Sequence, residues 1–285
     1  MTNRPSFSDL CRRLSSAYDE GEARAVVRLL LEEAFGLSLS DMLCGGVESL
    51  SPTDAERLDL MMQRLAAMEP VQYVVGHEWF CGRKFRVTPA VLIPRPETQQ
   101  LVSLATAAIA GKEDQSDVLD IGTGSGCIAV SIAAACPEAR VEAWDLSDDA
   151  LAVARENARE NGVSVRFSRQ DALQAPCDAD RWDAIVSNPP YIPERERQQM
   201  SLNVTGHEPG MALFVPDGDP LVFYRAIARY AAKALRPGGT LLFETHTRLA
   251  GDVAALVLQE GLSGAEVLDD IFDRPRFVRC RRACP

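Results

Sequence analysis

Two short segments of this 285-residue sequence combine residue types that could bind a ligand and carry out chemistry. The first is the run DIGTGSG at residues 120–126, whose candidate binding residues are Gly122, Thr123, Gly124, Ser125 and Gly126. Glycines let the backbone turn tightly and approach a ligand without a Cβ in the way. Cys127 stands where a dinucleotide GxGxxG fingerprint requires its third glycine. This departure argues against an NAD-dependent oxidoreductase.

Two acidic residues follow later apolar segments, at positions where strands are expected to end. Asp145 closes such a segment, and its carboxylate could accept hydrogen bonds from both ribose hydroxyls of a nucleoside bound across the glycine loop. Asp171 lies past the next expected strand, near the place of an adenine amino group. Together with the loop, the two acids favour an adenosyl ligand. The alternative is that Asp145 only caps a helix, a role that Ser147 could serve equally.

The second segment is Asn188-Pro189-Pro190-Tyr191, which follows the apolar run Ala184–Ser187. Prolines lack an N–H group and restrict the backbone, so this segment presents carbonyl acceptors in a fixed geometry. The Asn188 side-chain oxygen and the Pro189 carbonyl could accept the two hydrogens of one planar NH2 group, with Tyr191 as a packing surface. Such acceptors favour the electron-rich nitrogen that attacks a methyl group. The alternative is a proline-rich turn that merely leaves a buried strand.

The elements that must position these segments follow from the periodicity of the apolar residues. Residues 1–76 contain two amphipathic helices, at 21–35 and 51–68, and predict a small helical domain. Residues 77–93 are rich in strand formers around Cys81-Gly82 and predict a β-hairpin linker. From residue 94 to 285 helices and strands alternate, which predicts an α/β domain with a doubly wound parallel sheet. Expected strands lie at 118–121, 141–145, 163–167, 184–187 and 240–243, and expected helices at 96–110, 125–136, 147–161, 221–235 and 249–259.

The amino-acid composition excludes some classes of protein and some kinds of binding partner. The chain carries 30 Lys and Arg against 41 Asp and Glu, a net charge of −11, and residues 1–76 contribute 7 − 12 = −5 of it. Nucleic-acid binders normally present a basic face, so direct nucleic-acid binding is not expected. Eight cysteines form no CxxC pair and no metal-ligand spacing. We also find no signal peptide and no membrane span, and therefore expect a cytoplasmic monomer without a metal.

The motifs together resemble a known family. DIGTGSG, Asp145 and NPPY resemble the class I (Rossmann-like) S-adenosylmethionine-dependent methyltransferases that act on planar NH2 groups. The segments EPVQYVVG at 69–76 and LIPRPET at 92–98 resemble the HemK/PrmC family, the peptide chain release factor glutamine N5-methyltransferases. This resemblance covers nearly the whole chain. Thr245-His246 and Asp273 depart from residues common in the family, outside the core motifs.

The resemblance implies a function and assigns roles to residues. The 122–126 loop and Asp145 would bind S-adenosylmethionine, with Asp171 and Ala172 beside the adenine and S-adenosylhomocysteine as the product. Asn188, Pro189, Pro190 and Tyr191 would hold the glutamine of a Gly-Gly-Gln motif in class I release factors, with Asn188 also next to the cofactor. Whether Arg95, Glu97 or His246 contact a ligand stays open.

Three other functions remain as alternatives. A glutamine methyltransferase acting on a ribosomal protein would share the chemistry and differ only in its substrate-facing surface. A DNA adenine N6-methyltransferase would also use NPPY, but it needs phosphate contacts and a means of flipping the base, against which the acidity of both domains argues. A non-catalytic adaptor with a degenerate nucleotide site is disfavoured by the intact loop and Asn188.

Overall fold

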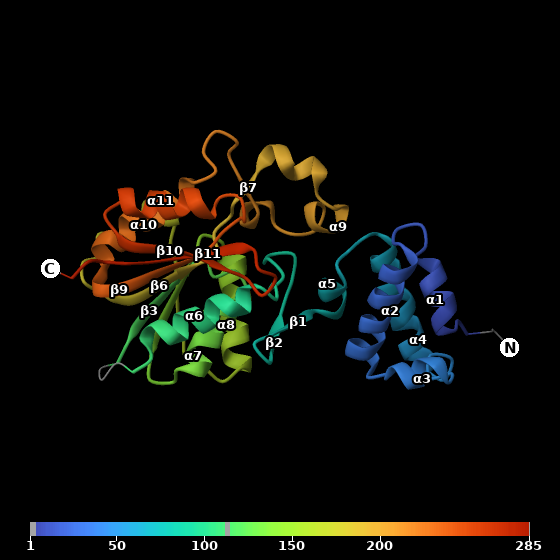
Figure 1. The fold of residues 1–285 in the computed structure, drawn as a ribbon. Coiled ribbons are helices and arrows are strands. Elements are labelled where there is room, and N and C mark those ends of the chain that lie inside the picture. The colour runs from blue at the N-terminus through green and yellow to red at the C-terminus, as the bar shows by residue number, and fades with distance from the viewer. Residues whose placement is uncertain (1–3, 112–114, 285) are drawn as a thin grey trace. The chain divides into compact units, whose positions relative to one another are not determined.

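The computed structural model describes residues 4–111 and 115–284 and separates into two compact units (Figure 1). The first unit contains the residues up to His77 together with Ser201–His207. The second contains Glu78–Met200 and the chain from Glu208 onward. A short segment from the middle of the second half of the sequence therefore packs with the amino-terminal helices, which the sequence did not indicate.

The first unit is helical, as the periodicity predicts. Its helices are α1 (Phe7–Arg13), α2 (Glu20–Phe35), α3 (Leu39–Leu43), α4 (Pro52–Ala66), α5 (Val71–Val75) and α9 (Leu202–Thr205). Asp19 caps the start of α2, and Gly36 ends it with a left-handed φ of 66°. Leu14, Leu30 and Leu65 are fully buried in the common core. The segment 201–207 is held there partly by a hydrogen bond between His207 and the Ala67 carbonyl, at 3.3 Å.

The predicted hairpin forms, but its strands are shorter than expected. Strands β1 (His77–Phe80) and β2 (Arg83–Arg86) are joined by Cys81 and Gly82, which both have a positive φ, as a two-residue hairpin turn requires. The strand-forming residues Val87, Val91 and Ile93 were expected to belong to it and do not. They are buried in an irregular segment instead, so their apolar character reflects burial and not strand pairing.

A seven-stranded sheet in the order β10-β11-β9-β6-β3-β4-β5 forms the centre of the second unit. Its parallel strands are β3 (Asp117–Ile121), β4 (Arg140–Asp145), β5 (Arg166–Arg169), β6 (Trp182–Ser187) and β9 (Leu235–Glu244). Strands β10 (Ser263–Asp269) and β11 (Pro275–Arg281) add an antiparallel edge. The strand expected at 163–167 begins three residues later, at Arg166. Because β4 and β6 flank β3, the order reverses at β3, and a ligand is expected at its carboxyl end.

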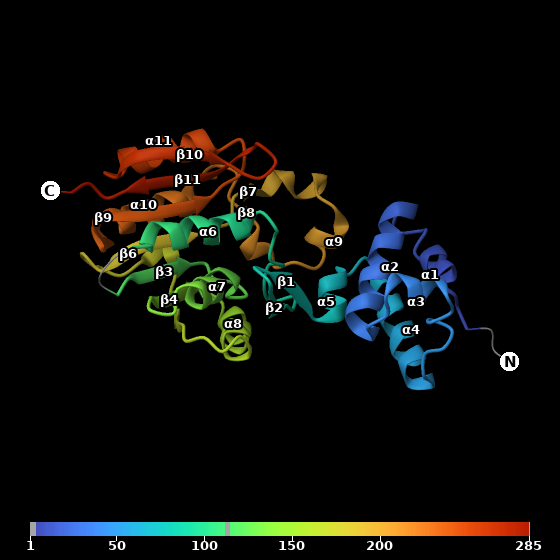
Figure 2. The ribbon, with the colours of Figure 1, turned by 60° about the horizontal axis from the view of Figure 1, so that its bottom comes forward.

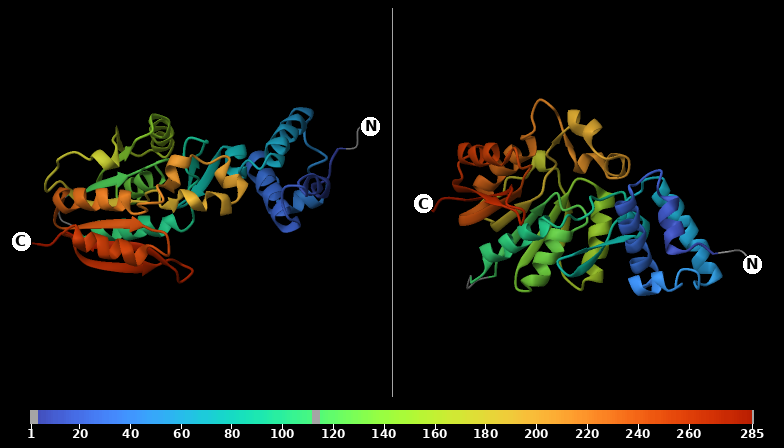
Figure 3. Two further views of the ribbon diagram at one scale, coloured as in Figure 1. Left: turned by 90° about the horizontal axis from the view of Figure 1, so that it is seen from above. Right: turned by 45° about the vertical axis from the view of Figure 1, so that its right-hand side comes forward.

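Helices cover both faces of this sheet (Figures 2 and 3). On one face lie α6 (Thr98–Ile109), α7 (Cys127–Ala135) and α8 (Asp148–Glu160), and on the other α10 (Val222–Ala234) and α11 (Ala250–Gln259). Alternate strand residues supply the two cores: Val118 and Ala184 face the first, Leu119 and Ile185 the second. The strands are therefore apolar on both sides, as in a doubly wound fold. No helix within the described residues is long and apolar enough to cross a bilayer.

Short elements fill the chain between β6 and α10, where the sequence pattern predicts none. Strands β7 (Ile192–Pro193) and β8 (Phe214–Val215) pair in parallel. The 3-10 turns η2 (Glu194–Gln199) and η3 (Gly210–Ala212) lie between them, and η1 (Ala172–Gln174) follows β5. Elements of two to six residues are too short to leave a periodic pattern, which is why they were missed.

Candidate active site

A cavity of about 400 Å³ opens at the carboxyl ends of β3, β4 and β6. It brings together most residues that the sequence singled out: Gly122, Gly124, Asp145, Asp171, Ala172, Asn188, Pro189 and Pro190. The remaining walls are largely apolar, with Leu92, Met211 and Phe223 among them. A mainly apolar pocket with a few convergent polar groups is the usual form of a small-molecule site.

The glycine loop forms one wall of this cavity. Gly122 and Gly124 have φ angles of 77° and 55°, and a Cβ built on either would meet no atom within 4 Å. The space beside both backbones is therefore open to a ligand. The N–H groups of Gly122 and Thr123 donate to the Trp144 carbonyl at 2.9 Å each, which fixes the loop against the end of β4.

The other loop residues pack against the protein interior and do not line the cavity. The buried Thr123 hydroxyl donates to Asp120 Oδ2 at 2.6 Å, and Ser125 is also buried. Gly126 is the N-cap residue of α7, and a Cβ added to it would lie 3.0 Å from the Ala154 Cβ. A glycine is needed there so that α7 and α8 can pack closely.

The two predicted acids both line the cavity, and both also organise the backbone. Asp145 Oδ2 accepts the Gly124 N–H at 2.8 Å, and its Oδ1 accepts the Ser147 N–H at 2.9 Å. Asp145 thus joins the end of β4 to the glycine loop, while Ser147 caps α8, so the helix cap does not account for Asp145. Asp171 caps η1, its Oδ1 accepting the Leu173 N–H at 2.8 Å.

The NPPY segment leaves β6 in a fixed position. The buried Ser187 hydroxyl donates to the Ile121 carbonyl at 2.7 Å, which ties the end of β6 to the end of β3. Asn188 follows at once, half-buried, with its Nδ2 donating to Thr98 Oγ1 at 3.4 Å. Pro189 is buried and Pro190 half-buried. The strand end therefore places the Asn188 carboxamide at the cavity wall.

Tyr191 packs next to the cavity and does not line it. Its ring lies edge-on to His246, with 5.9 Å between ring centroids. Burial, with a further contribution from Glu244, raises the pKa of Tyr191 to about 12. The hydroxyl therefore stays protonated near neutral pH and cannot act as a base.

Arg95, Glu97 and His246 also stand outside the residues that line the cavity. Arg95 donates to Glu208 Oε1 at 2.6 Å, and Glu208 is buried. Burial lowers the pKa of His246, whose Nδ1 accepts the Arg248 N–H at 3.1 Å. The contacts of Arg95 and His246 therefore lie outside the cavity wall.

One residue that supports the site was missed by the sequence analysis. Asn157 of α8 is fully buried; its Nδ2 donates to the Ser125 carbonyl at 2.8 Å and to the Arg86 carbonyl at 3.0 Å. Its Oδ1 accepts the Arg86 N–H at 2.7 Å. Asn157 thus joins the hairpin to the glycine loop. The available signal was an asparagine on the apolar face of α8, at helical spacing from Ala150 and Ala154.

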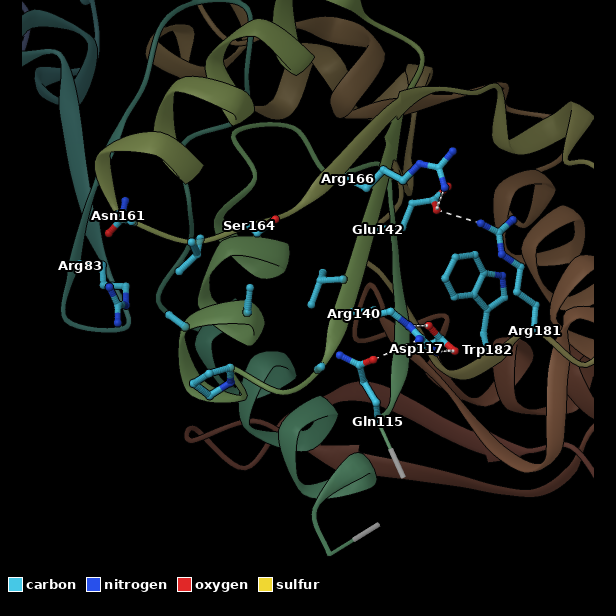
Figure 4. Close-up of a pocket in the computed structure, with 17 residues that line it drawn as sticks. Arg83, Gln115, Asp117, Arg140, Glu142, Asn161, Ser164, Arg166, Arg181 and Trp182 are labelled. Atoms are coloured by element: carbon cyan, nitrogen blue, oxygen red, sulfur yellow. Dashed lines mark hydrogen bonds and ion pairs between the residues drawn. The ribbon is translucent and has the colours of Figure 1, made fainter. Parts of the chain in front are cut away.

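A larger cavity of about 800 Å³ lies at the opposite edge of the sheet, at the amino ends of β3, β4 and β5 (Figure 4). Three of the arginines that line it pair with acids: Arg140 with Asp117 at 2.6 Å, and Arg181 and Arg166 with Glu142 at 2.8 and 3.8 Å. The pairing offsets part of their charge. This edge carries none of the motif residues, so size alone does not mark it as the active site.

The buried Asp120 carboxyl should make the free energy of unfolding depend on pH. Burial raises the pKa of its carboxyl from 3.8 to about 7, and Asp145 adds to the rise. Between pH 3.8 and about 7, Asp120 holds a proton in the folded protein that it has lost in the unfolded chain. The contribution of Asp120 to stability therefore falls as the pH rises toward 7 and is constant above it. Compared with Asp120→Asn, the wild-type protein should lose on the order of 2 kcal/mol in free energy of unfolding between about pH 5 and about pH 8. Urea denaturation measures this; a constant difference between the two proteins would contradict it.

Comparisons with known proteins identify the fold and the class of enzyme. A family model described as "Methyltransferase small domain" matches residues 98–206. A solved structure titled as a methyltransferase from Pyrococcus furiosus superposes with a TM-score of 0.51 at 15% identity, covering 82% of this chain and all of that one. This likeness shows the fold. The protein is a methyltransferase with the class I fold that the sequence predicted.

The family follows from more similar relatives. A model described as "PrmC N-terminal domain" matches residues 7–76. Two proteins named release factor glutamine methyltransferase are each 42% identical to this chain. The protein from Bacteroides thetaiotaomicron aligns over 94% of this chain and 96% of its own length, and that from Cereibacter sphaeroides over 91% of each. The chain belongs to the release factor glutamine methyltransferase family, and the predicted resemblance is confirmed.

Proposed function

We propose that the protein transfers a methyl group from S-adenosylmethionine to the side-chain nitrogen, N5, of the glutamine in the Gly-Gly-Gln motif of class I release factors. The observation that carries the proposal is the position of Asn188-Pro189 on the wall of the same cavity as the glycine loop and Asp145. A donor and an amide acceptor could therefore meet there. The products would be S-adenosylhomocysteine and the N5-methyl amide, whose nitrogen releases one of its two protons to solvent.

The residues on the wall fit an adenosyl group. The open space beside Gly122 and Gly124 suits a close backbone approach, and Asp145 keeps carboxylate lone pairs for ribose hydroxyls. Asp171 and Ala172 line the same cavity beside apolar neighbours, and we assign them to the adenine. When bound, S-adenosylmethionine supplies an electrophilic methyl group on a sulfonium. The chain itself binds and orients the two reactants.

The Asn188 and Pro189 oxygens then act on the attacking amide. An amide nitrogen is a poor nucleophile because its lone pair is delocalised into the carbonyl. Two acceptors that bind both N–H bonds hold the nitrogen in place and stabilise the positive charge that it gains as the methyl group transfers. Both hydrogen bonds strengthen toward the transition state, so they raise turnover more than binding.

The test is to incubate the protein with labelled S-adenosylmethionine and a class I release factor, then to map the methylated residue by mass spectrometry. Label on the glutamine of the Gly-Gly-Gln motif is the expected result. In a parallel reaction with ribosomal proteins, label on a glutamine there and none on the release factor would show that the substrate is a ribosomal protein. Label on adenine in DNA, or failure to bind S-adenosylmethionine at all, would overturn the proposal.

We further propose that the helical region, residues 1–76, recognises the release factor, that 77–93 link it, and that 94–285 carry out catalysis. The support is the net charge of −5 on residues 1–76, which suits a basic protein surface. Glu48 and Glu56 are exposed acids of this region. Reversing both should leave the cofactor site intact.

The double variant Glu48→Lys/Glu56→Lys is expected to raise KM for intact release factor by about threefold to tenfold, since electrostatic complementarity governs encounter. Methylation of a short Gly-Gly-Gln peptide should not change. Steady-state kinetics at low and high salt measure both. The matched control reverses two exposed acids of the second unit, Glu138 and Glu160. An unchanged KM for the intact factor in the first variant would exclude this docking surface.

A further inference from the structure

Three side chains from distant parts of the second unit form a row that ends at Asn188. Thr98 is the first residue of α6, and Glu244 is the last residue of β9. The Thr98 hydroxyl donates to Glu244 Oε2 at 2.7 Å, and Asn188 Nδ2 donates to Thr98 Oγ1 at 3.4 Å. Thr98 and Glu244 are 3% and 2% exposed, so water does not compete for these bonds. Neither residue lines the cavity.

The available hydrogens determine which group donates and which accepts in each hydrogen bond of this row. An ionised carboxylate only accepts, so the single hydroxyl hydrogen of Thr98 is committed to Glu244. Thr98 Oγ1 then offers only lone pairs to Asn188, and only the NH2 end of the carboxamide can bond to it. The oxygen end, Oδ1, is thereby turned away from Thr98. No hydrogen bond from the described residues occupies Oδ1.

This orientation matters because the two ends of an asparagine carboxamide have the same shape and opposite polarity. With Oδ1 toward the substrate, Asn188 accepts a hydrogen from the glutamine NH2 group. Rotated by half a turn, it would present an NH2 group to another NH2 group, and the acceptor would be lost. An exposed asparagine would sample both arrangements, so a device that selects one of them raises the rate.

The protonation state of Glu244 determines which groups donate and which accept in the hydrogen bonds of this row. Burial raises the pKa of Glu244 to about 7, against the hydrogen bond from Thr98 and the charge of Arg276, which lower it. Below that pH the protonated carboxyl can donate to Thr98, whose own hydrogen is then free to point at Asn188 and bind Oδ1. The other charged or titratable groups that act on this carboxyl, or feel its charge, are Glu97, Arg95, Tyr191 and Tyr224.

We propose that Thr98 and the ionised Glu244 are positioning residues, which hold the Asn188 carboxamide with Oδ1 toward the amide nitrogen to be methylated. The inference rests on the proposed function and names two residues that act through Asn188 without touching either reactant. It also gives a physical reason for a threonine at the end of the PRPET segment: a hydroxyl that donates to one side and accepts from the other.

Thr98→Val keeps the shape and removes the hydroxyl. We expect its kcat to fall about tenfold, the effect of one hydrogen bond, with the Kd for S-adenosylmethionine unchanged within about twofold. Thr98→Ser restores the hydroxyl and should recover most of the rate. In an Asn188→Ala background the Thr98→Val change should have almost no further effect, because it acts only through Asn188. A tenfold loss that persists in that background would overturn the proposal.

Glu244→Gln tests the direction of the row without changing its shape. The wild-type kcat should fall below about pH 7, as Glu244 becomes protonated. The glutamine variant has no carboxyl to protonate, and its carboxamide oxygen can still accept from Thr98, so its kcat should lack this acidic limb. A Glu244→Gln enzyme that keeps the acidic limb of the wild-type pH profile would refute the role of Glu244, even if Thr98→Val folds poorly.

A readout that needs no turnover separates this inference from the proposed function. In the wild-type protein, the NMR signal of the Asn188 side-chain NH2 group should titrate near pH 7 with Glu244. The signal should not titrate in Glu244→Gln or Thr98→Val. A signal that is insensitive to pH in all three proteins would overturn the inference. Absence of methylation on the release factor, with the titration intact, would overturn the proposed substrate alone.

Discussion

Asn188→Ala is expected to lower kcat by about a hundredfold or more, the usual cost of removing one preorganised hydrogen-bonding group from a transition state. The Kd for S-adenosylmethionine should change little. In the proposed mechanism the Asn188 oxygen meets a neutral NH2 group in the bound substrate and an increasingly positive one during transfer. Single-turnover kinetics with the release factor, together with calorimetry for the cofactor, separate the two effects.

Asn188→Asp sharpens this test. The carboxylate keeps an acceptor and the shape, but it cannot donate to Thr98 as Asn188 Nδ2 does at 3.4 Å, and it adds a charge close to the buried Glu244. Partial activity with a changed pH profile is expected. Tyr191→Phe provides the contrast: the ring packs against His246, so the loss should be small. A fully active Asn188→Ala enzyme would reduce NPPY to a rigid turn.

The sheet could be predicted from the sequence because its strands are buried on both faces. Val118 and Leu119 face different cores, as do Ala184 and Ile185, so each strand appears as a short, continuous apolar run. The turn residues between these runs then fix the order of helices and strands. The sheet edge could be placed less well: β5 has only half-buried or exposed residues, so its start was predicted three residues too early.

The cavity wall could be predicted in outline for a related reason. Asp145 is the last residue of β4 and Asn188 follows directly on β6, and parallel strands end at one edge of a sheet. The direction of individual side chains could not be predicted. Thr123 and Ser125 lie in the glycine loop yet point into the protein, where Thr123 binds the buried Asp120. Loop membership alone does not distinguish the two faces of a loop.

The sequence analysis missed the residues that support the site because their contacts join positions far apart in the sequence. Thr98 meets Glu244 across 146 residues, and Asn157 meets Arg86 across 71. Neither pair leaves a local pattern, because the two partners lie in different elements that only the fold brings together. Both pairs nevertheless support site residues, Asn188 in the first case and the Ser125 backbone in the second. A buried polar residue without a local partner is therefore a useful signal for residues that support a site.

Asp145→Ala should weaken S-adenosylmethionine binding by about 1.5–3 kcal/mol, the range for hydrogen bonds to a charged group. This corresponds to a rise in Kd of roughly tenfold to 150-fold. The variant also leaves the Gly124 and Ser147 N–H groups without their acceptor, so part of the loss could come from a loosened loop. Asp148→Ala is the matched control, since it removes an exposed carboxylate three residues further along that does not line the cavity. Its Kd should stay at the wild-type value.

An analogue series separates the ribose contact from the loop contact. S-adenosylhomocysteine lacking the 2′- or 3′-hydroxyl should bind the wild-type protein more weakly than the parent compound, because each analogue lacks a donor to the Asp145 carboxylate. Asp145→Ala should bind all three compounds with nearly equal affinity, since the partner of the missing hydroxyl is itself absent. Calorimetry gives the four corners of each cycle. If Asp145→Ala still discriminates between the compounds as strongly as the wild-type protein, the carboxylate only organises the glycine loop, and another group on the wall reads the ribose.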